Sequence, residues 1–106
     1  APSLAIIRYL QDNGAIVKAY DPKGIGQAKP ELPDITYTAD AYSCIDGADA
    51  LCLVTEWEQF RALDLDRIKS LLKAPIIIDL RNIYKPEDMR RRGFTYYSIG
   101  RKPVIV

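Results

Sequence analysis

The fold is decided by two short apolar stretches, DALCLVT at residues 49–55 and PIIID at residues 75–79. Continuous apolar runs of this length, without polar alternation, are typical of parallel strands that are covered on both faces. Between them lies a helical pattern that begins after Asp64 and places Leu65, Ile68 and Leu72 on one face. Since a strand, a helix and a second strand follow in that order, the stretch predicts a parallel sheet flanked by helices.

The same alternation continues toward both ends of the chain. Further strands are predicted at residues 15–20, 35–37 and 94–97, and a loop at 23–33. Helices are predicted from residue 4 to about residue 13, from Thr38 as a cap to Gly47, and from Pro86 to Gly93. We therefore expect an α/β fold, a three-layer αβα Rossmann-like domain with a mainly parallel sheet of about five strands.

Composition excludes several classes of protein. The 106 residues are 48% hydrophobic and 27% charged, which suits one folded domain and not a disordered chain. The formal net charge of +1 does not suggest a nucleic-acid partner. No apolar run approaches the roughly 18 residues of a membrane span, and the given sequence does not open with a basic-then-apolar leader pattern. With Cys44 and Cys52 taken as reduced thiols, we expect a cytoplasmic protein.

Neither a catalytic centre nor a metal site is predicted within this chain. It has no histidine, the commonest general base and metal ligand. Two cysteines without histidine cannot build a standard zinc site, and neither cysteine has a histidine neighbour to activate it. The pair Gly24 and Gly26 lacks the third glycine and the context of a dinucleotide-binding loop. These absences leave binding, not catalysis, as the expected role.

Ligands of open α/β sheets bind beyond the carboxyl ends of the strands. Lys23 follows the strand at 15–20, Glu56 follows the strand at 49–55, and Arg81 and Asn82 follow the strand at 75–79. Arg81 suits bidentate pairing with a phosphate, although a structural salt bridge explains it equally well. Asp79 is the candidate partner for such a bridge, with Arg81 or with Lys23.

The other residues at these ends have plainer explanations. Asp21-Pro22 is a common way to begin a turn, and Trp57 fits a packing role. The last strand leads to Ser98, Gly100 and Arg101. The run at 90–92, three arginines, fits a solvated helix end.

The first helix has no strand before it, and the chain opens with Ala1 in place of Met. We therefore expect a piece of a longer protein. In this interpretation residues 1–100 form the domain, and residues 101–106 form a tail that hangs free or pairs with something absent.

Several short motifs together resemble one known domain. They are YDPK at 20–23, GADA at 47–50, TEW at 55–57, F at 60 with LD at 63–64, DLRNIY at 79–84, GF at 93–94 and YSIGR at 97–101. In this order they resemble the carboxyl-terminal, UDP-binding domain of UDP-glucose 6-dehydrogenases, within the UDP-glucose/GDP-mannose dehydrogenase family. The resemblance spans nearly the whole chain.

The resemblance implies the UDP-sugar-binding part of an NAD-dependent enzyme that oxidises UDP-glucose twice, to UDP-glucuronate. NAD and the catalytic groups would be held mainly by an amino-terminal domain that this chain lacks, so the chain alone is expected to be inactive. The implied partners are the UDP-sugar, the rest of the parent chain and further copies of a homo-oligomer, with no nucleic acid and no membrane.

The resemblance also bears on the site residues. It makes Arg81 the main contact to the nucleotide sugar, with Asn82, Lys23 and Glu56 as further substrate-binding candidates. Leu80 stands where the family commonly has glycine, which disfavours a close backbone approach there.

Other classes of function fit the sequence as well. One is a free-standing regulatory module that senses a nucleotide or docks a partner, and another is a purely structural oligomerisation domain. A receiver-type signalling domain shares the expected topology, but the sequence shows no matching acidic cluster beside Asp21 or Asp79.

Overall fold

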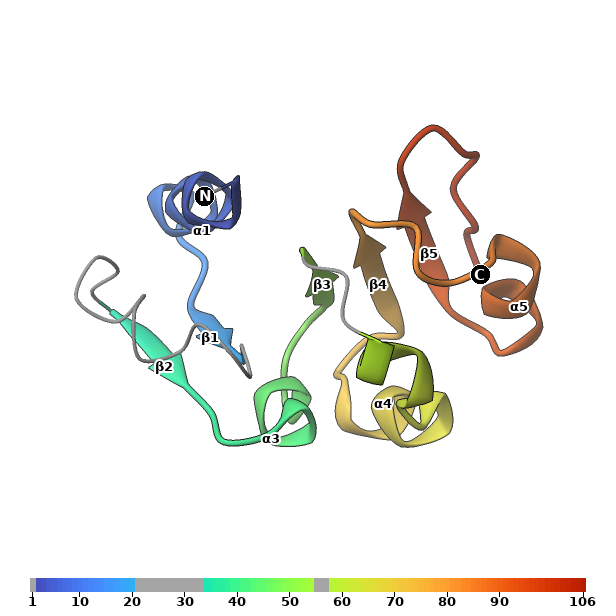
Figure 1. Cartoon of the computed structure of the whole chain (residues 1–106), viewed down its shortest axis with the longest axis horizontal. Coiled ribbons are helices and arrows are strands. Elements are labelled where there is room, and N and C mark those ends of the chain that lie inside the picture. Colours follow the sequence, from blue (N-terminus) through green and yellow to red (C-terminus); the bar gives the residue numbers. More distant parts are fainter. Residues whose placement is uncertain (1, 21–33, 55–57) are drawn as a thin grey trace. The chain divides into compact units, whose positions relative to one another are not determined.

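The structure, a computed structural model, describes residues 2–20, 34–54 and 58–106. It divides into two compact units, residues 1–44 and 45–106, which are described in turn. Helices alternate with strands along the second unit, whereas the described residues of the first unit include two strands in succession (Figure 1). Every strand pair is parallel, which confirms the α/β class.

The first unit contains α1 (Pro2–Asp12), β1 (Val17–Ala19), β2 (Ile35–Tyr37) and most of α3 (Ala41–Ile45). β1 and β2 form a two-stranded parallel sheet in which Val17 pairs with Ile35. Gly14 follows α1 with φ at +91°, a conformation that favours glycine, so the helix ends where the sequence predicts.

The cap of α3 differs from the prediction. Asp40, not Thr38, accepts a hydrogen bond from the backbone N–H of Ser43 at 2.9 Å, which is the contact that defines an N-cap. The Thr38 hydroxyl instead donates to the carbonyl of Asp40 at 2.9 Å. Because Asp40 directly precedes the helix, its shorter reach to the third helical residue makes it the better cap.

The second unit is built on a three-stranded parallel sheet in the order β3-β4-β5, with β4 in the middle. The strands are β3 (Leu51–Leu53), β4 (Ile76–Asp79) and β5 (Thr95–Ser98). They are joined through the 3-10 helix η2 (Glu58–Ala62), α4 (Leu65–Leu71) and α5 (Pro86–Arg91). The five expected strands are thus present, divided between two hydrogen-bonded sheets.

Local sequence signals account for the helices of this unit. The Asp64 carboxylate accepts from the backbone N–H of Arg67 and caps α4, as predicted. Pro86 occupies the first turn of α5, where a missing N–H costs nothing. Ile68, Ile77 and Met89 are fully buried, so α4, β4 and α5 each contribute to the core of the unit.

The carboxyl-terminal segment packs against the sheet. Val104 forms an antiparallel bridge with Tyr96, through backbone hydrogen bonds of 2.8 and 2.9 Å, and only 1% of its surface is exposed. The expectation that residues 101–106 hang free, or pair with something absent, is therefore wrong at Val104. β5 is an edge strand with unpaired backbone groups, and Val104 satisfies two of them while burying an apolar side chain.

Val104→Ala is expected to lower the free energy of unfolding of the chain by about 2 kcal/mol, because it removes buried apolar surface and leaves a cavity. Ile105→Ala is the matched control, since Ile105 is 67% exposed, and it should change stability by less than about 0.5 kcal/mol. Urea unfolding followed by circular dichroism measures both. Equal effects of the two substitutions would show that the segment does not pack.

Candidate functional site

A buried carboxylate organises the carboxyl end of β4. Asp79, the last residue of that strand, is fully buried and accepts four hydrogen bonds. Three come from backbone N–H groups, those of Arg81 at 3.1 Å, Ile83 at 2.7 Å and Tyr84 at 3.0 Å. Since a buried carboxylate is costly unless its oxygens are satisfied, the chain after β4 curls around it as a turn. We call residues 80–84 the Asp79 turn.

The fourth donor comes from the neighbouring strand. The hydroxyl of Tyr96, on β5, lies 2.6 Å from the Asp79 carboxylate and donates to it. Burial and the hydrogen bond to Asp79 raise the pKa of Tyr96 far above its ordinary value, although nearby Arg101 acts in the opposite direction. The hydroxyl therefore keeps its proton and remains a donor throughout the neutral range.

A second link ties the Asp79 turn to the segment that follows β5. The side-chain amide of Asn82 accepts from the backbone N–H of Ile99 at 2.9 Å and donates to its carbonyl at 3.0 Å. Asn82 has φ at +52°, a left-handed conformation that asparagine tolerates better than most residues. The ends of β4 and β5 are thus held together at one edge of the sheet.

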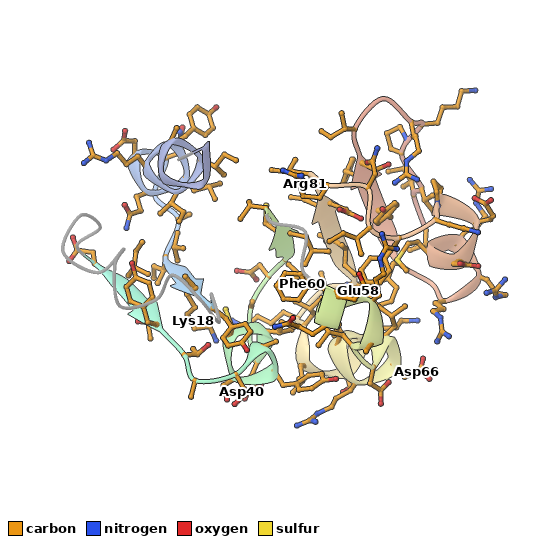
Figure 2. The ribbon with its side chains drawn as sticks, in the orientation of Figure 1. Lys18, Asp40, Glu58, Phe60, Asp66 and Arg81 are labelled. Atoms are coloured by element: carbon orange, nitrogen blue, oxygen red, sulfur yellow. The ribbon has the colours of Figure 1, made fainter. Side chains whose placement is uncertain are left out.

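Arg81 lies on this turn and its side chain is exposed. Figure 2 shows it at the arrowhead end of β4, the edge at which parallel α/β sheets bind their ligands. The turn is fixed by the bonds to Asp79 and Asn82, so the backbone that carries this exposed side chain is constrained. This arrangement suits the capture of a phosphate or carboxylate.

Of the other candidate site residues predicted from the sequence, the structure describes only Asn82. Asn82 lies beside Arg81, with its side chain engaged with Ile99. Lys23 and Glu56 lie outside the described residues, as do Asp21, Pro22 and Trp57.

The roles of Asp79 and Tyr96 are not predicted from the sequence. The sequence makes Asp79 a candidate ion-pair partner of Arg81 or Lys23, and the contacts above make it the centre of a turn. A usable signal was present, because an aspartate that ends an apolar run of three isoleucines must satisfy its oxygens locally. Tyr96 carried no such signal, since its contact depends on the alignment of β5 with β4.

Other chemistry has little support among the described residues. Cys44 and Cys52 are free thiols, and burial raises the pKa of each, which disfavours the reactive thiolate. The described part of the chain holds no group of three or more residues suited to binding a metal ion. Among the helices described, none is both long and apolar enough to cross a membrane.

Similarity to known proteins agrees with this geometry. The UDP binding domain of the UDP-glucose/GDP-mannose dehydrogenase family matches residues 1–86. UDP-glucose 6-dehydrogenase of Rhizobium meliloti is 46% identical over 101 residues, which cover 95% of this chain and 23% of that protein. UDP-glucose 6-dehydrogenase TuaD of Bacillus subtilis is 43% identical over 105 residues, 98% of this chain and 23% of that protein.

A solved structure is similar as well. It is the NDP-N-acetyl-D-galactosaminuronic acid dehydrogenase of Methanosarcina mazei Go1, with a TM-score of 0.77 and 25% identity, covering 95% of this chain and 21% of that one. The chain thus spans about a quarter of the length of the relatives that it matches. The match covers most of the chain and confirms the resemblance seen in its motifs: the chain belongs to the UDP-glucose/GDP-mannose dehydrogenase family, in which it corresponds to the UDP binding domain.

Proposed function

We propose that this chain is the nucleotide-binding part of an NAD-dependent UDP-glucose 6-dehydrogenase, and that Arg81 binds the diphosphate of the UDP-sugar. The observation that carries the proposal is the position of Arg81, an exposed residue on a turn that is fixed at the carboxyl edge of a parallel sheet. UDP-glucose is favoured over other nucleotide sugars because relatives at 36–46% identity are named UDP-glucose 6-dehydrogenases.

The chemistry of the guanidinium fits this role. Arginine presents a planar set of N–H donors that matches two phosphate oxygens, and its charge persists at every physiological pH. Because the turn is already held by Asp79 and Asn82, its backbone loses little freedom when the ligand binds, which leaves more of the interaction energy as affinity. Lys23 and Glu56, which follow two other strands in the sequence, are proposed as further contacts.

Binding of UDP at this edge would promote the reaction although UDP itself does not react. UDP is not the reacting part of the substrate, so its binding energy is available to orient the sugar C6 alcohol and to close the active site. The rest of the parent protein would supply NAD, which accepts the hydrides, and the catalytic residues. In this proposal the parent enzyme is a cytoplasmic homo-oligomer. Residues 1–100 form the domain that binds the nucleotide, and the segment 101–106 adds Val104 to the edge of its last strand.

Arg81→Ala in the full-length enzyme is expected to raise KM for UDP-glucose by about tenfold, since charge-assisted hydrogen bonds to a partly exposed group contribute roughly 1.5 kcal/mol. kcat should change by less than about twofold, because the guanidinium does not touch the reacting carbon. Steady-state kinetics of NADH formation provide both constants.

Arg90→Ala is the matched control, because it removes the same charge from an exposed position on α5. Its KM should equal that of the unaltered enzyme. An unchanged KM for Arg81→Ala, or an equal rise for both variants, removes Arg81 from the binding site.

The isolated chain of 106 residues is expected to form no NADH from UDP-glucose and NAD, because it holds no catalytic residue in this proposal. Calorimetry should detect UDP weakly at best, with GDP weaker still. Turnover by the pure chain would contradict the assignment of catalysis to the rest of the parent protein.

A further inference from the structure

The Asp79 turn is held by a chain of contacts that begins at Arg101, in the segment after β5. The Arg101 guanidinium donates through Nη2 to the Tyr96 hydroxyl at 3.0 Å and to the Tyr84 carbonyl at 3.1 Å. Its Nε donates to the Ser98 hydroxyl at 2.9 Å, which fixes the remaining side of the group. The guanidinium also lies over the Tyr96 ring, 5.8 Å from its centre. Arg101 is therefore directed inward, unlike the exposed Arg81.

These contacts form a relay. Arg101 donates to Tyr96, Tyr96 donates to Asp79, and Asp79 accepts from the backbone N–H of Arg81. The Tyr96 hydroxyl has one proton, and the 2.6 Å contact to Asp79 is shorter than its 3.0 Å contact to the Tyr84 carbonyl, so the proton points to the carboxylate. The positive charge of Arg101 thus compensates the buried carboxylate through one intervening hydroxyl.

The opposite side of the turn is held separately. Arg61, on η2, donates to the carbonyl of Ile83 at 2.8 Å, and the Tyr84 hydroxyl donates to the carbonyl of Phe60 at 2.6 Å. Without the Tyr96 hydroxyl, the turn would therefore stay attached to η2. It would lose the hydrogen bond that orients the Asp79 carboxylate. The expected result is a displaced Arg81, not an unfolded unit.

We propose that Tyr96 and Arg101 are positioning residues for nucleotide-sugar binding, which act through Asp79 to orient Arg81 and do not touch the substrate. This inference rests on the proposed function of Arg81. It predicts that removing the relay weakens substrate binding only while Arg81 is present to bind.

Tyr96→Phe tests the relay, because it removes the hydroxyl and keeps the buried ring. In the full-length enzyme it should raise KM for UDP-glucose about three- to tenfold, the equivalent of one hydrogen bond, with kcat nearly unchanged. In the Arg81→Ala background the same substitution should change KM by less than about 1.5-fold, because coupled residues are not additive. Arg101→Gln, at a half-buried position, should behave in the same way and provides a second variant.

Two controls separate positioning from other effects. Tyr97→Phe makes the same chemical change on the neighbouring residue of β5, which is 40% exposed. Ile68→Val removes one buried methyl group from α4, outside the Asp79 turn, and lowers the free energy of unfolding by about 1 kcal/mol. Both should leave KM within about 1.5-fold of the unaltered enzyme, a margin well below one hydrogen bond.

The outcomes are distinguishable. An unchanged KM for Tyr96→Phe and Arg101→Gln, or an equal rise with and without Arg81, overturns the positioning role while the proposed function stands. A comparable rise for Ile68→Val attributes the effect to stability and also overturns it. An unchanged KM for Arg81→Ala overturns the proposed function, and the inference with it.

Discussion

A carboxylate buried at the end of a central strand is the constraint on which the site depends. Asp79 has no exposed surface, so its oxygens must find donors inside the protein. It finds three on the backbone of the following turn and one on β5. The same bonds that satisfy the charge determine the path of residues 80–84. The location of Arg81 at the sheet edge is a consequence of this local requirement.

This arrangement connects the fold to binding. The carboxyl ends of parallel strands lie at one edge, and here the ends of β4 and β5 are joined by Asn82 and Ile99. Arg81 and Arg101 follow these two strands but differ in role: Arg81 is exposed, whereas Arg101 is used to support Tyr96. A fixed backbone that carries an exposed arginine suits an anionic group that takes no part in the reaction. In the proposed enzyme, the diphosphate of the nucleotide sugar is such a group. Specificity for the sugar would then depend on other parts of the parent protein.

Sequence alone predicts those features that depend on near neighbours. The apolar runs locate β3 and β4, Asp64 and Pro86 locate the helix starts, and the order of strands predicts parallel pairing.

Features that depend on contacts distant in sequence were not predictable. Val104 was assigned to a free tail because nothing in its own neighbourhood shows that the edge of β5 accepts it. Thr38 and Asp40 are both good caps by type, and only the position of the first helical turn decides between them. Arg81 could be selected from its position after a strand, whereas the support from Tyr96 requires the register of β5 against β4.

The most direct test of the central claim is a crystal structure of the full-length enzyme with UDP-glucose bound. We predict that N–H groups of Arg81 lie about 2.9 Å from diphosphate oxygens, with the Asp79 turn in the conformation described above. A diphosphate bound away from this edge, or an Arg81 guanidinium turned inward against the protein, would contradict it.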